Sequence, residues 1–197
     1  MRRLIGVLLV FALLPVAASG ATTWKTHTVK AAHFRVDAPG VWIDVTRLSP
    51  QVLAKAKQIP SLSQYIELAQ QQKAIKLILV DVGATTVKNH YATNMNVVEA
   101  PAFGDLQLLR DATAAQLKSS GIVVGNVATS YVTLPAGKAV RLLYRARYST
   151  SSPIVSLLQY VFLHNGTSAV ITFTTLPSLR ATYAAVFTRS AKSFRFL

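Results

Sequence analysis

The last third of the chain alternates apolar and polar residues over runs of eight to eleven residues, separated by short turns. A period of two places successive side chains on opposite faces of a β-strand. Asn165-Gly166 lies between two of these runs, and this dipeptide is typical of a tight hairpin turn. The pattern therefore predicts four consecutive antiparallel strands, at Val127–Leu134, Lys138–Tyr148, Val155–His164 and Ser168–Thr175.

Strand patterns also occur in the first half of the chain. Thr22–Lys30 alternates, and His33–Asp37 continues the pattern up to a turn at Pro39-Gly40. Lys76–Val82 is apolar on both faces, which is typical of a central strand covered on both sides. Thr93–Glu99 is the next predicted strand. These segments and the C-terminal runs predict an antiparallel sheet of about six or seven strands.

Helix signals separate these strands. Ser49-Pro50 combines an N-cap hydroxyl with proline at the first helical position, and Asp105 is a second N-cap with Gly121 beyond the helix end. The predicted helices run from Ser49-Pro50 to Gln58, from Ser61 to Gln72, from Asp105 to Ser119, and from Ala181 to Ala191. Phe194 and Phe196 then finish the chain as a strand or a clamp.

Helices that lie before and after antiparallel strands must cover the apolar faces of their sheet. We therefore expect an α+β fold, an α/β/α sandwich with a central antiparallel sheet. The composition shows no second boundary, so residues 22–197 are predicted to be a single domain.

Residues 1–21 begin with two arginines, continue with an apolar run at Leu4–Leu14 and end in small residues. This order is typical of a secretory signal peptide. The run has 11 residues, fewer than the about 20 that a membrane-spanning helix needs. We expect cleavage between Ala21 and Thr22, with a second option after Val16–Ala18 and an uncleaved anchor as the alternative. The predicted location is secreted or extracytoplasmic.

The charge balance predicts anionic partners. The sequence has 21 basic and seven acidic residues, a net charge of +14. Without residues 1–21 it keeps 19 basic residues against seven acidic ones, a net charge of +12. Such an excess attracts phospholipid headgroups, acidic polymers or nucleic acid. The alternative is that the charge serves general solubility, with only weak and non-specific adhesion. The sequence has no cysteine, which excludes disulfides and a lipid-modified cysteine.

The most basic predicted strand is Lys138–Tyr148. Because side chains alternate, Arg141, Arg145 and Arg147 share one face, opposite an apolar face of Val140, Leu142 and Tyr144. Three guanidinium groups on one face can bind phosphate or carboxylate groups in bidentate fashion, and Tyr131 and Tyr160 could add flat surfaces. The alternative is a solvated sheet edge whose cations prevent aggregation.

A polar stretch at residues 89–96 interrupts the apolar strands. Asn94 and Asn96 fall on one face of the next strand, and each amide both donates and accepts hydrogen bonds. One interpretation is a hydrogen-bonding patch for a polar ligand. The other is that the amides cap a loop and the start of the strand.

Catalytic and metal signals are weak. The four histidines have no metal-ligand spacing, and no cofactor motif or hydrolase nucleophile motif occurs. We therefore predict no metal, no cofactor and no catalytic residue. The alternative is a hydrolase acting on envelope material. Asp81 and Glu99, on strands that could be neighbours, are the one carboxylate pair that could serve it.

The order of these motifs resembles a known family. Phe34–Trp42, a strand ending in Pro-x-x-Trp, precedes Lys76–Asp81, Tyr91–Val97, Leu134–Val140 and the segments Gln159–Phe162 and Ile171–Phe173. This order over most of the chain resembles the PsbP-like, or Mog1/PsbP/DcrB-type, domain, and within it the secreted and lipoprotein members of the LpqN-like group. The resemblance implies an α/β/α sandwich and binding or assembly work. The lipoprotein anchor is not implied, because this chain lacks the cysteine.

We therefore expect a secreted, non-catalytic binding or accessory protein of the cell envelope. Its expected partner is an envelope protein or an anionic lipid or polymer, with contact to a membrane surface and no specific nucleic acid. Arg141, Arg145 and Arg147 would supply the attraction, with further contacts near Asn94 and Asn96.

Overall fold

The structure is a computed structural model that describes residues 23–49 and 60–197. The signal peptide predicted at residues 1–21 lies outside the described residues, and so do residues 50–58 of the helix predicted from Ser49-Pro50 to Gln58.

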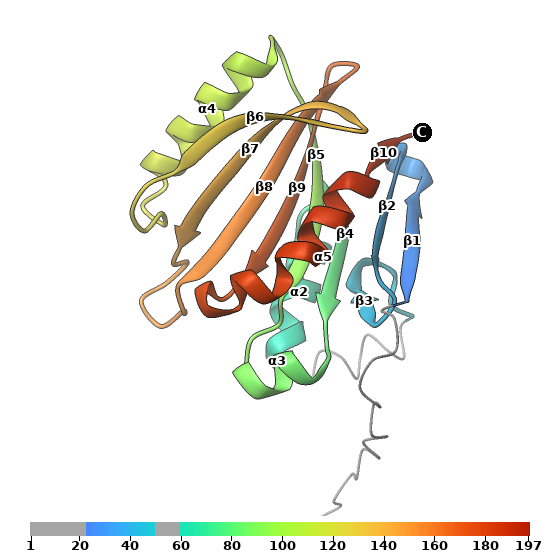
Figure 1. Ribbon diagram of the computed structural model, residues 1–197, viewed down its shortest axis with the longest axis vertical. Helices are drawn as coiled ribbons and strands as arrows, with labels where there is room; N and C mark the ends of the chain where they lie inside the picture. The colour runs from blue at the N-terminus through green and yellow to red at the C-terminus, as the bar shows by residue number, and fades with distance from the viewer. Residues whose placement is uncertain (1–22, 50–59) are drawn as a thin grey trace, which may run out of the picture.

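A seven-stranded antiparallel sheet forms the centre of the molecule (Figure 1). Its order across the sheet is β3-β4-β5-β9-β8-β7-β6. These strands are β3 (Trp42–Asp44), β4 (Ile75–Asp81), β5 (Asn94–Pro101), β9 (Thr167–Thr175), β8 (Val155–His164), β7 (Gly137–Ala146) and β6 (Ala128–Leu134). The predicted α+β class and strand number are confirmed.

A second, three-stranded sheet contains β1 (Trp24–Val29), β2 (Phe34–Pro39) and β10 (Arg195–Phe196), in that order. The sequence predicted the first two as strands, but they pair with each other and with the C-terminus instead of joining the large sheet. Periodicity identifies a strand but not its partners, and one partner of β2, the strand β10, lies at the far end of the chain.

Four α-helices occur in the described residues: α2 (Pro60–Gln71), α3 (Ala84–Asn89), α4 (Leu106–Ser119) and α5 (Arg180–Ser193). Three short 3₁₀ turns lie at Lys30–Ala32, Val45–Arg47 and Pro177–Leu179. The predicted cap of α4 is confirmed, because the Asp105 carboxylate accepts a hydrogen bond from the Leu108 N–H at 2.8 Å. Neither α3 nor β3 was predicted, since each is too short to show a period.

The large sheet has two differently covered faces. We call the face toward α5 and the small sheet the front, and the opposite face the back (Figure 1). The front carries the main core, with residues of β4, β5, β8 and β9 packed against Phe187 of α5 and Phe194. On the back, α2 covers Ile78 and Val80, while α4 covers Val140 and its neighbours. Alternation along each strand fixes which residues reach which face.

The Asn165-Gly166 turn joins β8 to β9 as predicted. Both residues have positive φ, 48° and 72°. Positive φ at both central residues is what a two-residue hairpin turn requires, because this twist matches that of the flanking strands.

Candidate functional site

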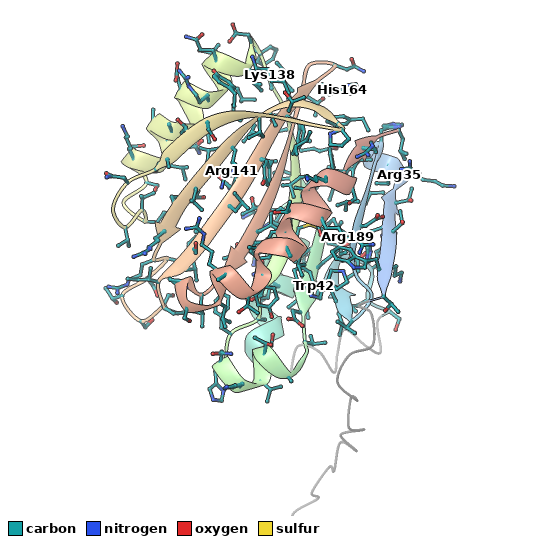
Figure 2. The ribbon with its side chains drawn as sticks, viewed as in Figure 1. Arg35, Trp42, Lys138, Arg141, His164 and Arg189 are labelled. Atoms are coloured by element: carbon teal, nitrogen blue, oxygen red, sulfur yellow. The ribbon has the colours of Figure 1, made fainter. Side chains whose placement is uncertain are left out.

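The basic row of β7 lies on the front face of the large sheet. Val140, Leu142 and Tyr144 point to the back and pack with residues of α4. Arg141 and Arg145 therefore point to the front, beside α5, where Figure 2 shows Arg141 on the part of the sheet that α5 leaves open.

Two adjoining hollows run along this open part of the front face. One, of about 410 Å³, lies between β6–β8 and α5 and includes Arg141, Arg180 and Lys192. The other, of about 280 Å³, includes Arg145 and again Arg180. We call the two together the basic groove, defined by the cations Arg141, Arg145, Arg180 and Lys192.

The cations of the basic groove have no acidic counterpart there. Among the described residues that line the two hollows, none is a carboxylate, and the ion pairs found in the described part of the chain involve none of the four cations. Burial raises the pKa of the Tyr160 hydroxyl, and the nearby Arg141 guanidinium offsets part of that rise. Because its arginines are not paired with carboxylates, the groove can donate pairs of guanidinium N–H bonds to a phosphate or carboxylate.

Arg147, expected in this row, and Tyr131, expected beside it, lie elsewhere. Strand β7 ends at Ala146 rather than Tyr148, so exposed Arg147 falls one residue beyond it and outside both hollows, with its backbone N–H bonded to the Ile122 carbonyl. Tyr131 lies under the cations of Arg110 and Lys138, at 5.3 and 4.9 Å from the ring centre. Tyr160, in contrast, lines the groove as expected.

Asn94 and Asn96 lie on the back face of β5, because the alternating residues Met95 and Val97 belong to the front core. They line a cavity of about 450 Å³ together with Tyr65, Tyr91 and Tyr148. We call this cavity the tyrosine–amide cleft.

Asn94 is partly committed to its own loop. Its Nδ2 donates to the Ala92 carbonyl at 3.2 Å and to the Tyr65 hydroxyl at 2.9 Å. The bond to Ala92 caps the loop before β5, which is the second interpretation given above. The bond to Tyr65 connects β5 to α2. Asn96 is only half-buried, and its side-chain amide has no hydrogen-bond partner among the described residues that line or surround the cleft.

The basic groove and the tyrosine–amide cleft lie on opposite faces of one sheet. The arginine row and the patch near Asn94 and Asn96, which were expected to act together, therefore lie on two separate surfaces. Alternation along β7 and β5 shows which residues of a strand share a face. Only the packing of α5, α2 and α4 shows that the arginines and the asparagines lie on opposite faces of the sheet.

The proposed carboxylate pair does not assemble. Strands β4 and β5 are neighbours, but the Asp81 N–H bonds to Thr93 at one end of the ladder and the Glu99 N–H bonds to Ala74 at the other. Seven residues of strand separate the two ends, roughly 20 Å, whereas glycosidase carboxyl groups are about 5–10 Å apart. Asp81 instead accepts hydrogen bonds from the Tyr183 hydroxyl and the Gly83 N–H, which secures α5 to the end of β4.

The side chains that could bind a metal ion are also not gathered into a site in the described part of the chain. The part of the chain that the structure describes holds no group of three or more histidine, aspartate or glutamate side chains placed to bind a metal. Buried His27 lies 3.9 Å from the Asp44 carboxylate, and His164 stacks on Phe196. A search of the same residues finds no helix with the length and apolarity to cross a membrane.

Three solved structures share the arrangement of strands and helices described above. PsbP (CyanoP) from Synechocystis sp. PCC 6803 has a TM-score of 0.57 at 13% identity, over 94% of this chain and 99% of that one. The Saccharomyces cerevisiae Ran-binding protein Mog1p has 0.54 at 11%, over 89% and 96%. LpqN, involved in cell envelope biogenesis of Mycobacterium tuberculosis, has 0.52 at 10%, over 88% and 90%.

The chain has the PsbP/Mog1/DcrB-type fold. No protein-family model matches its sequence, and no curated protein does either. At these identities the likeness carries the fold alone, so the groove and the cleft must be argued from the residues of this chain.

Sequence reasoning missed part of each site within this PsbP/Mog1/DcrB-type fold. Arg180 and Lys192 lie at the two ends of α5, and their distance from Arg141 in the chain gives no local signal. Tyr65 and Tyr148 come from α2 and from the segment after β7. The residues of each site come together only because β5, β9, β8 and β7 are neighbours in the sheet and the helices pack on its two faces.

Proposed function

We propose that the protein is an exported, non-catalytic binding protein of the cell envelope that engages an acidic segment of a protein partner through the basic groove. The observation that carries the proposal is the set of four cations in one groove. Unpaired cations in a concavity raise the local concentration of anions and speed their capture.

Export is supported by the pattern of residues 1–21, with its two arginines, apolar run and small-residue end. A role in binding is supported by two proteins of the same fold, since Mog1p is Ran-binding and LpqN takes part in envelope biogenesis. The hydrolase alternative has lost its proposed pair, because Asp81 and Glu99 lie at opposite ends of the β4–β5 ladder.

The shape of the groove favours a chain over a flat surface. Arg141 is only partly exposed, and its hollow is enclosed by β6 on one side and α5 on the other. A planar bilayer surface cannot enter between two elements, whereas an extended acidic peptide can place carboxylates against successive guanidinium groups.

The proposal is tested with a fluorescently labelled oligo-glutamate peptide, titrated with the purified chain at low and high salt. The double variant Arg141→Ser/Arg145→Ser removes two groove cations. The matched control Lys25→Ser/Arg147→Ser removes the same charge from exposed positions outside the hollows. We expect the groove variant to bind at least about tenfold more weakly, since charge-assisted hydrogen bonds contribute about 1.5–3 kcal/mol each, and the control to stay within about twofold.

Equal weakening by both double variants would contradict the proposal, because attraction would then follow net charge and not the groove. Vesicles containing phosphatidylglycerol are a separate arm of the experiment. Groove-dependent binding to vesicles without binding to the peptide would replace the protein partner with a membrane.

A further inference from the structure

We infer that the tyrosine–amide cleft is a second binding site, for a neutral polyhydroxylated ring compound of the saccharide class. The cleft lies on the back of the sheet, away from the basic groove, so this inference does not depend on the proposed function. Three observations carry it: a row of polar side chains across the sheet, the tyrosines around it, and the absence of strong charge among the described lining residues.

The polar row crosses three neighbouring strands. Asn96 of β5 is in register with Thr172 of β9, which is in register with Gln159 of β8, and Asn94 is in register with Thr174. On either side the same face is apolar, with Ile78 under α2 and Leu142 under α4. Polar side chains in the middle of a sheet face are costly to bury unless they are hydrogen-bonded.

Only part of that hydrogen-bonding capacity is used within the protein. The Gln159 Nε2 donates to Thr172 Oγ1 at 3.0 Å, and Asn94 is bonded as described above. The Asn96 amide makes no side-chain hydrogen bond with another described residue, and it borders the cavity. It therefore offers two donors and an acceptor to a ligand. A ligand hydroxyl, itself both donor and acceptor, matches this group.

Three tyrosines give the cleft its flat apolar surfaces. Tyr91 is half-buried, and its hydroxyl lies near Tyr65 and Asn94. Burial is the main cause that raises the pKa of Tyr91 far above its ordinary value, so this hydroxyl stays protonated and neutral. Tyr148 is 58% exposed at the mouth of the cleft and presents its ring to an entering molecule. Aromatic faces beside hydrogen-bonding groups suit a sugar ring, which has apolar C–H faces and polar edges.

The charge of the cleft separates it from the basic groove. Lysine, arginine, aspartate and glutamate are absent from the described residues that line it, and His90 is the one histidine among them. An anion or cation would lose its hydration here without gaining a counter-charge. The cavity of about 450 Å³ is within the range of about 300–1,000 Å³ that small-molecule sites occupy. An uncharged molecule of modest size is therefore the matching ligand.

The test uses the purified full chain and a panel of neutral disaccharides, with cellobiose and N,N′-diacetylchitobiose as the probes. Saturation-transfer NMR detects binding, and the ¹⁵N side-chain amide signal of Asn96 locates it. We expect at least one disaccharide to bind and to shift the Asn96 signal. Asn96→Ala should weaken this binding at least about tenfold, because it leaves a ligand hydroxyl unpaired in a half-buried site.

The matched control is Asn126→Ala, at an exposed position on the other side of the sheet, and it should change affinity less than twofold. Tyr148→Leu retains apolar bulk at the mouth but removes the ring, and we expect a several-fold loss with an unchanged fold. The inference is overturned if no disaccharide transfers saturation, or if the two asparagine variants behave alike. Binding of adenosine in place of the sugars, with the same Asn96 shift, would overturn the saccharide class.

Discussion

The two faces of strand β7 and its neighbours show how one sheet can present opposite chemistry to its surroundings. On the front, Arg141 and Arg145 face a groove without carboxylates. On the back, β5 and β9 present amides and hydroxyls to a cleft lined by tyrosines. Attraction in the groove is electrostatic, so it weakens with salt, whereas hydrogen bonds in the neutral cleft are nearly indifferent to salt. Under the two binding proposals made above, the two faces therefore bind different classes of partner.

The front of the sheet depends on a buried aromatic cluster. Phe194 is fully buried, and its ring centre lies 5.4 Å from that of Phe34, 5.3 Å from Phe162 and 5.2 Å from Phe196. This cluster joins the small sheet and the end of α5 to the large sheet. Phe194→Ala should lower the free energy of unfolding by about 3–5 kcal/mol, because it removes a ring from a packed core.

Denaturant unfolding followed by circular dichroism measures this loss. Phe103→Ala is the matched control, since Phe103 is 87% exposed, and it should change stability by less than about 0.5 kcal/mol. A small effect of Phe194→Ala would mean that the front core does not hold α5 against the sheet, and the groove would then lack a fixed wall.

The next largest effect is expected at the contact between Tyr183 of α5 and Asp81 of β4. The buried Asp81 carboxylate accepts a hydrogen bond from the Tyr183 hydroxyl. Tyr183→Phe should destabilise the protein by about 1.5–3 kcal/mol, since a hydrogen bond to a buried charged group is lost. Tyr131→Phe, at a 39% exposed tyrosine, is the control and should be nearly neutral.

The same contact predicts a loss of stability in alkali. Burial and the hydrogen bond to Asp81 raise the pKa of Tyr183 to about 12, from an ordinary value of 10.0. The folded protein therefore holds this proton more tightly than the unfolded chain does, and the contribution to stability is complete below pH 10. It should disappear as the pH rises from about 10 to about 12. Unfolding measured across this interval should show a steeper fall in the wild type than in Tyr183→Phe.

How far the sequence could predict these features differs between the fold and the sites. Alternation in Lys138–Tyr148 correctly separated Arg141 and Arg145 from Val140, Leu142 and Tyr144, because strand geometry is local. It could not show that β7 stops at Ala146, since that end depends on where β8 begins to pair with it at Val155. Arg147 was therefore grouped with a row from which the structure separates it.

The sites required tertiary information. Asn94 and Asn96 were identified from a polar stretch, but the tyrosines around them come from three segments that only the folded chain brings together. Arg180 and Lys192 complete the groove only because α5 crosses the sheet beside β7 and β8. The Asp81–Glu99 pair failed for the same reason, since adjacency of two strands does not fix which ends of them meet.

The smallest predicted effect concerns α4, which covers the back of β7 while the groove occupies its front. The Asp105 carboxylate caps this helix through the Leu108 N–H. Asp105→Ala should lower the free energy of unfolding by about 1 kcal/mol, and Asp111→Ala, at an exposed mid-helix position, should lower it by less. If the two faces are independent, binding of the oligo-glutamate peptide to the folded Asp105→Ala variant stays within about twofold of the wild type. A larger change would show that packing on the back face sets the positions of Arg141 and Arg145 on the front, and the two faces would then be one coupled unit.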